Sequence, residues 1–163
     1  THVHADPLSA APYLDEALGG KIGIGARITV VQETFGKVFN EGTRFARDGS
    51  QFDRLFKEGD TLMVGQMRVD VMHTPGHTPG SVCLYARGPR VLFTGDVLQV
   101  RFGKLAFASP IFSHDHAQAR ASVQRLTHLE VDMIAFSHYR PMREGASAAL
   151  AGLARQAASG RSG

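Results

Sequence analysis

Residues 73–81 read His-Thr-Pro-Gly-His-Thr-Pro-Gly-Ser, a segment in which two Pro-Gly pairs flank His77. Proline fixes φ, and glycine permits backbone conformations that other residues rarely adopt, so the segment predicts a rigid turn that holds one imidazole in place. Residues 67–72 before it and 81–85 after it have the apolar pattern of short strands. The sequence therefore predicts a histidine presented from a loop between two strands, where functional sites are usually built.

Two more predicted strands end in a potential ligand. Asp96 follows the apolar strand 91–93, and His138 follows the apolar strand 131–136. At the beginning of the chain two histidines and an aspartate alternate, so in an extended segment all three project to one side. Since His and Asp are natural ligands of zinc and non-haem iron, we expect a shared metal centre. Its candidate ligands are His2, His4, Asp6, His77, Asp96 and His138.

The hydrophobic periodicity predicts a layered α/β domain. We expect helices at 8–18, 28–39, 115–129 and 144–156, strands at 21–25, 61–64, 67–72, 81–85, 91–93 and 131–136, and long loops at 40–59 and 102–112. Residues 1–156 are expected to form one domain, and residues 157–163 a flexible tail.

Composition narrows the classes of protein that fit. The chain has 163 residues, a net charge of +3 and eight histidines, and Cys83 is its only cysteine. A disulfide framework and a four-cysteine zinc site are therefore excluded. No apolar run approaches a membrane span, and the basic residues are scattered, so neither a membrane nor a nucleic acid is an expected partner. We expect a cytoplasmic protein that takes a small-molecule substrate; an oligomer is possible.

The order of these motifs resembles the metallo-β-lactamase fold superfamily. That resemblance runs from residue 1 to about residue 153 and implies an αββα sandwich with the metal at one edge. It implies that His2, His4 and His77 bind a first metal, that Asp96 bridges, and that Asp6 with His138 binds a second. One position departs from the pattern, because Pro7 stands where the superfamily has a further histidine. This difference favours a single metal ion or a weakly filled second site.

Two resemblances within the superfamily point to different chemistry. Residues 5–60 are similar to persulfide dioxygenases, which implies a single iron(II) held by His2, His77 and Asp96, with glutathione persulfide as substrate. From residue 93 onward the chain is more similar to general metallo-hydrolases. That implies one or two zinc ions and a metal-activated water that attacks an ester, thioester or amide carbonyl, with Asp6 orienting the water. The hydrolase is the preferred interpretation; a dioxygenase and an inactive metal-binding fragment are the alternatives.

The remaining residues of interest receive plainer interpretations. Cys83 lies in the middle of an apolar strand and is expected to be buried and not a nucleophile. Arg101, Tyr139 and Arg140 lie near predicted ligands, and they are candidates for holding an anionic group of the substrate. In the superfamily several strands precede the first histidine motif, so the chain is expected to lack the N-terminal strands of the fold.

Overall fold

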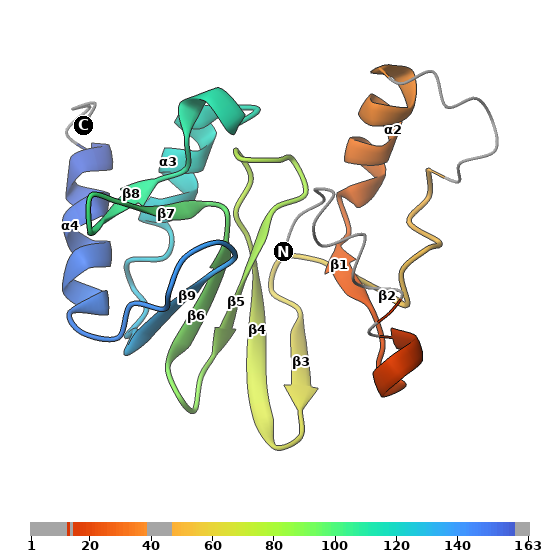
Figure 1. Ribbon diagram of the computed structural model, residues 1–163, viewed down its shortest axis with the longest axis horizontal. Helices are drawn as coiled ribbons and strands as arrows, with labels where there is room; N and C mark the ends of the chain where they lie inside the picture. Colours follow the sequence, from red (N-terminus) through yellow and green to blue (C-terminus); the bar gives the residue numbers. More distant parts are fainter. Residues whose placement is uncertain (1–12, 14, 39–46, 159–163) are drawn as a thin grey trace.

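The computed structural model describes residues 13, 15–38 and 47–158 (Figure 1). The elements in chain order are β1 (Gly23–Gly25), α2 (Ile28–Val38), β2 (Arg54–Phe56), β3 (Thr61–Val64), β4 (Met67–His73), β5 (Val82–Ala86), β6 (Val91–Gly95), β7 (Leu98–Arg101), β8 (Lys104–Phe107), the 3-10 helix η1 (Pro110–Phe112), α3 (His116–Gln124), β9 (Met133–Phe136) and α4 (Ala146–Ala158). The α/β class expected from the sequence is confirmed.

A five-stranded sheet forms the centre of the described structure, in the order β3-β4-β5-β6-β9 (Figure 1). Neighbouring strands run antiparallel from β3 to β6, whereas β9 runs parallel to β6. The β6–β9 crossover passes through the β7–β8 hairpin and α3. Strands β4, β6 and β9 therefore run in the same direction, so the carboxyl ends of all three lie at the same edge of the sheet.

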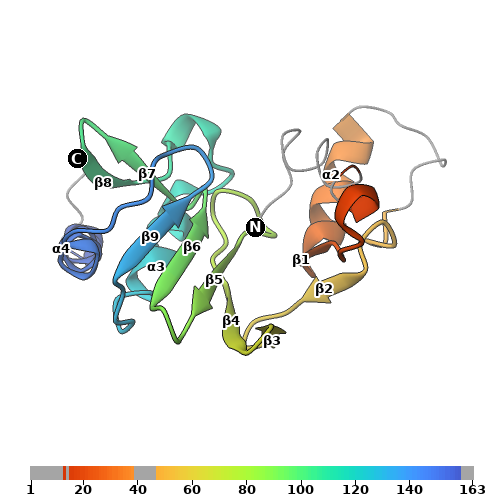
Figure 2. The ribbon, with the colours of Figure 1, turned by 60° about the horizontal axis from the view of Figure 1, so that its bottom comes forward.

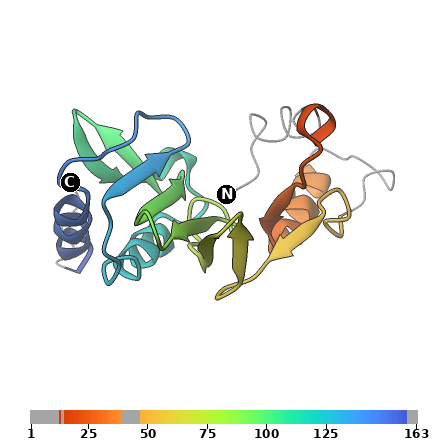
Figure 3. The same ribbon diagram turned by 90° about the horizontal axis from the view of Figure 1, so that it is seen from below.

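The main core lies between this sheet and the helices α3 and α4, which Figure 3 shows on one side of it. Inward-facing side chains of β5, β6 and β9 meet apolar side chains of both helices, and α3, α4 and β8 contact one another. Each of β5, β6, β9, α3 and α4 contributes fully buried side chains to this core, among them Cys83, Leu92, Val123, Ile134 and Leu150. This packing holds the strand ends that carry the candidate ligands in fixed positions.

A smaller unit precedes the sheet in the chain and consists of α2 with the parallel pair β1 and β2 (Figure 2). Ile24, Ile28 and Val31 form its buried cluster. Its β1 end approaches the loop before β5 so closely that a Cβ on Gly25 would lie 2.5 Å from the carbonyl oxygen of Gly80. A side chain at this glycine would therefore separate the unit from the loop that carries His77.

Several expected elements differ from those observed. The loop expected at 40–59 contains β2, and the segment expected as a loop at 102–112 contains β8 and η1. Both strands are short, and β2 lies in a polar segment and pairs with β1, which is distant in the chain, so no local pattern reveals it. Helix α3 ends at Gln124 and not at residue 129, because turns follow it.

At the two ends of the chain the expectations are only partly covered. Of the helix expected at 8–18, residues 13 and 15–18 are helical, and residues 8–12 and 14 lie outside the described residues. Helix α4 continues to Ala158, two residues into the expected tail, and residues 159–163 are not described. Among the helices that the structure does describe, none has the length and apolar character needed to cross a membrane.

Candidate metal centre

Three of the predicted ligands come together at one edge of the sheet. His77 lies in the loop between β4 and β5, Asp96 directly follows β6, and His138 follows β9 two residues later. The side chain of His77 is buried with 5% of its surface exposed, that of Asp96 is 15% exposed, and that of His138 is 50% exposed. The set therefore runs from the protein interior to the solvent.

The carboxylate of Asp96 lies between the two imidazoles. Its Oδ2 atom is 3.6 Å from Nε2 of His77 and 3.3 Å from Nε2 of His138. Carboxylate oxygens and imidazole nitrogens are the kinds of donor that zinc and iron prefer. The bridging role that the superfamily resemblance implies for Asp96 stays a prediction.

The loop that carries His77 is fixed by its own hydrogen bonds. The amide of Thr74 donates to the carbonyl of Ser81 at 2.9 Å, which closes the loop at its base. The Ser81 hydroxyl accepts from the amide of Thr78 at 3.1 Å and lies 2.9 Å from the Thr78 hydroxyl. These bonds agree with the rigid turn that the Pro-Gly pairs predict.

Helix α3 and the two residues before it hold the same loop. The amides of His114 and Asp115 donate to the carbonyls of His77 and Gly76, at 3.0 and 2.8 Å, and the Ser122 hydroxyl donates to the carbonyl of Pro75 at 2.7 Å. These contacts join residues about 40 positions apart in the chain, so no local sequence pattern could reveal them. The sequence gives no signal that distinguishes Ser122 from an ordinary helical serine.

His73, at the end of β4, also contacts this loop. Its Nε2 atom lies 2.8 Å from the carbonyl oxygen of Pro79. Arg125 donates to the His73 carbonyl at 3.0 Å and pairs with Glu58 at 2.5 Å, and the amide of His73 donates to Glu58. His73 therefore supports the segment that positions His77, and it does not line the cavity of the three ligands.

A cavity of about 270 Å³ opens beside the three side chains. Its remaining lining residues are apolar, aromatic or neutral polar: Leu98, Gln99, Ala108, Ser109, Phe112 and Tyr139. Of the three residues that the sequence suggested for an anionic substrate group, only Tyr139 is among them, with its hydroxyl 3.5 Å from Oε1 of Gln99. Arg101 and Arg140 are exposed and do not line this cavity.

The other predicted ligands, His2, His4 and Asp6, lie outside the described residues, as does Pro7. Within residues 13, 15–38 and 47–158, no group of three or more His, Cys, Asp or Glu side chains is placed so that it could hold a metal ion by itself. The donor chemistry of His77, Asp96 and His138 nevertheless fits a zinc or iron ion. The structure thus supplies part of a ligand set, to which further donors must be added.

Comparison with known proteins agrees with this geometry. The family profile described as the metallo-beta-lactamase superfamily matches residues 1–138. A probable metallo-hydrolase of Burkholderia pseudomallei is 63% identical over 79 residues, which are 48% of this chain and 27% of that protein. Glyoxylase B2 of Dictyostelium discoideum is 42% identical over 99 residues, 60% of this chain and 34% of that protein. The matches span only about a quarter to a third of these curated relatives.

Solved structures show the same fold at low sequence identity. A metallo-β-lactamase superfamily protein from Sulfolobus tokodaii has a TM-score of 0.67 at 19% identity, over 96% of this chain and 65% of that chain. A metallo-β-lactamase from Pontibacter korlensis has a TM-score of 0.66 at 18% identity, over 95% of this chain and 66% of that one. The fold that the sequence predicts is confirmed, and the chain belongs to the metallo-β-lactamase superfamily.

Proposed function

We propose that the protein is a metal-dependent hydrolase that uses water to cleave an ester, thioester or amide bond of a small molecule. The observation that carries this proposal is the carboxylate of Asp96, placed between the Nε2 atoms of His77 and His138 beside a cavity. Three potential metal ligands from three different strand ends therefore lie together, as the binding of a shared ion requires.

In this proposal His77, Asp96 and His138 hold the metal together with His2, His4 and Asp6. When bound, zinc lowers the pKa of a coordinated water to about 7 and stabilises negative charge on a carbonyl oxygen. The protein's own contribution is a fixed ligand geometry, which the hydrogen bonds of the His77 loop supply. Asp6 is proposed to orient the attacking water and accept its proton.

The names of the relatives support hydrolysis as the reaction class. Besides the probable metallo-hydrolase, they include an acyl-coenzyme A thioesterase of Gallus gallus, 49% identical over 45 residues. Those residues are 28% of this chain and 16% of that protein. A thioesterase and a metallo-hydrolase share water as the nucleophile, so the proposal is limited to that shared step.

The iron-dependent persulfide dioxygenase remains a prediction from residues 5–60. The single-iron ligand set that this resemblance implies does not include His138. In the structure His138 lies as close to Asp96 as His77 does, which favours the larger ligand set. A cytoplasmic location also remains a prediction from the sequence.

The test is the metal content of the purified chain, measured by mass spectrometry, with turnover of simple thioesters measured on the same samples. We expect one or two zinc ions per chain and expect Asp96→Ala and His77→Ala to lose both metal and turnover. His128→Ala is the matched control, because His128 is exposed and does not line the cavity. Unchanged metal stoichiometry in Asp96→Ala would contradict the site. Iron with oxygen uptake on glutathione persulfide would instead select the dioxygenase.

A further inference from the structure

A second cavity lies where the small unit of α2, β1 and β2 meets the five-stranded sheet. It has a volume of about 350 Å³, and residues from both sides of this junction line it, among them Arg27 before α2, Lys57 after β2 and His73 at the end of β4. None of its described lining residues belongs to the cavity beside the three candidate metal ligands. The proposed hydrolase reaction therefore does not account for this second cavity.

The backbone places two cationic residues next to each other at this cavity. Strands β1 and β2 pair in parallel, with Gly25 opposite Phe56, so the segments that follow them leave the pair at the same end. The amide of Ala26 donates to the carbonyl of Phe56 at 2.6 Å, which keeps these two segments together beyond the strands. Arg27 and Lys57 are the next residues of the two segments, and both line the cavity.

These two cations have no anionic partner in the part of the chain that the structure describes. The side chains of Arg27 and Lys57 form no hydrogen bond or ion pair with a described residue. The nearby carboxylate of Asp60 accepts a hydrogen bond from the backbone amide of Lys57 at 2.8 Å, and it forms no ion pair with the Lys57 ammonium group. Two like charges at one cavity repel each other, and an anion between them would remove this repulsion.

The one carboxylate on the described lining of this cavity, that of Glu58, already has partners. Its Oε1 atom accepts from the guanidinium group of Arg125 at 2.5 Å, and its Oε2 atom accepts from the backbone amide of His73. Arg125 therefore offsets the negative charge of Glu58. Of the charged residues on the described lining, Arg27 and Lys57 remain without a partner of opposite charge.

We propose that this cavity binds a small anion with two negative charges, whose oxygens pair with Arg27 and Lys57. A guanidinium group donates two parallel hydrogen bonds to one phosphate or carboxylate group, and an ammonium group adds a point charge. The hydroxyl of Thr29, also on the lining, is a further donor. Pockets for small molecules usually measure about 300 to 1,000 Å³, and this cavity, at about 350 Å³, is at the lower end of that range. Small phosphate monoesters and small dicarboxylates share the required charge and size.

The position of this cavity connects a bound anion with the loop that carries His77. His73 lines the cavity, and its Nε2 atom donates to the carbonyl of Pro79, 2.8 Å away, because a carbonyl oxygen can only accept. Gly25 is also on the lining and lies against the carbonyl of Gly80 in the same loop. An anion in the cavity would therefore contact both the small unit and the base of the loop, and its binding should stabilise the folded protein.

The test measures the binding of inorganic phosphate to the purified full chain by calorimetry, at an ionic strength held constant with sodium chloride. We expect saturable binding with a Kd of about 1 mM or tighter, and an unfolding temperature that rises until the site is filled. Arg27→Gln and Lys57→Gln should each weaken this binding by roughly tenfold or more, the scale of one lost hydrogen bond between charged groups. Asp96→Ala, which is expected to lack the metal, should keep one phosphate site per chain.

Arg143→Gln and Lys104→Gln are the matched controls, because both residues are exposed and neither lines this cavity. They make the same changes of charge and should keep the phosphate affinity of the wild type. Arg27 and Lys57 are exposed as well, so we expect their variants to fold, which circular dichroism checks. Three results would each overturn the inference: no saturable binding, equal weakening in the control variants, or binding that Asp96→Ala loses and Arg27→Gln keeps.

Further titrations identify the class of anion. Glycerol phosphate represents the phosphate monoesters and succinate the dicarboxylates, and whichever binds more tightly to the Asp96→Ala chain assigns the class. Acetate carries a single charge and should bind more weakly than both. If acetate bound as tightly as glycerol phosphate and succinate, a site for two negative charges would be contradicted.

Discussion

At the scale of single residues, Cys83 shows how burial decides reactivity. It lies in β5 with none of its surface exposed, and its sulfur is 3.4 Å from the Thr74 hydroxyl. Burial raises the pKa of this thiol to about 12, although the contact with Thr74 acts in the opposite direction. The expectation that this cysteine is a buried, non-nucleophilic residue agrees with the structure.

The reactivity of this thiol can be measured directly. In the native protein at pH 8 we expect Cys83 to react with an aromatic disulfide reagent at least a hundredfold more slowly than in denaturant, because the thiolate is the reacting form. The reaction in urea is the control, since it must reach one thiol per chain. Rapid reaction of the folded protein would show that β5 opens in solution.

At the scale of elements, the contact between α3 and the His77 loop fixes the site. Gly76 has a φ of +132°, and a Cβ at this position would lie 2.1 Å from the backbone nitrogen of Ala119. Glycine is therefore required at this position for two reasons: its backbone conformation has a positive φ, and α3 leaves no room for a side chain. Through this contact, α3 holds in place the loop that carries His77.

Replacement of this glycine tests the contact. We expect Gly76→Ala to lower the free energy of unfolding by about 2 to 4 kcal/mol, from backbone strain and from overpacking against α3. Gly88→Ala is the control, because a Cβ at Gly88 has nothing within 4 Å and no positive φ opposes it. Urea denaturation measures both variants. A loss of stability as large in Gly88→Ala as in Gly76→Ala would argue against the contact as the cause.

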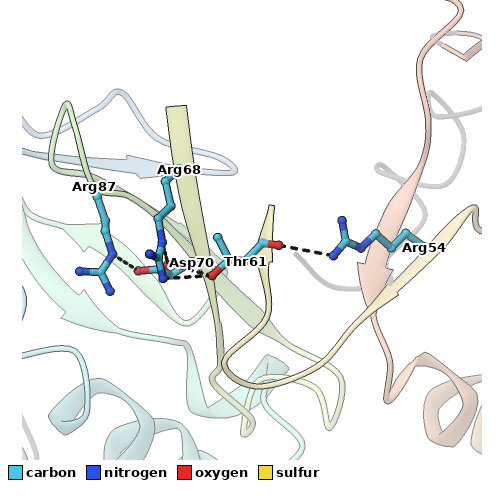
Figure 4. A network of polar contacts seen from close by, with 5 residues as sticks. All are labelled: Arg54, Thr61, Arg68, Asp70 and Arg87. Atoms are coloured by element: carbon cyan, nitrogen blue, oxygen red, sulfur yellow. Dashed lines mark hydrogen bonds and ion pairs between the residues drawn. The ribbon is translucent and has the colours of Figure 1, made fainter. Parts of the chain in front are cut away.

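A polar network on β4 links neighbouring elements (Figure 4). Asp70 pairs with Arg68 at 3.2 Å and with Arg87, beyond β5, at 2.5 Å. Burial alone would raise the pKa of Asp70, but the two guanidinium groups outweigh it and hold this pKa below the ordinary value of 3.8. The ion pairs of Asp70 stabilise the folded protein above pH 3.8, where this carboxylate is charged in both the folded and the unfolded protein. This contribution is lost as the pH falls through the pKa of Asp70 in the folded protein.

We therefore expect a pH-dependent difference between the wild type and Asp70→Asn. Near pH 7 the variant should be less stable by about 1 to 2 kcal/mol, and the difference should shrink as the pH falls below 3.8. Asp132→Asn, which removes a more exposed partner of Arg90, should have a smaller effect. Denaturant curves at several pH values measure this. A difference that stays constant down to pH 2 would rule out the charge as its origin.

At the scale of the whole molecule, the small unit of α2, β1 and β2 adjoins the five-stranded sheet at two places. Arg54 of β2 donates to the carbonyl of Thr61 in β3 at 3.4 Å, as Figure 4 shows. At the other place, the end of β1 lies against Gly80 in the His77 loop. The unit therefore contacts both the edge strand of the sheet and the loop of the candidate site.

The sequence predicted most of the elements and missed others for identifiable reasons. The hairpin of residues 61–64 and 67–72 has a strong alternation and was correctly expected as β3 and β4. The strands β2, β7 and β8 were missed: they are short, β2 pairs with the distant strand β1, and β8 lies in a segment expected to be a loop. Helix α3 was expected to be too long, because Leu126 is buried in the turns that follow it and continues the apolar pattern.

The sequence by itself determined which residue types are available for a metal and where they lie relative to the strands. His77, Asp96 and His138 each follow a strand because apolar runs and turn residues are local features of the chain. Only the tertiary structure decided that they meet, since the strand order and directions bring the ends of β4, β6 and β9 to one edge. The support of the His77 loop by α3, and the cavity beside Asp96, likewise depend on contacts between distant segments.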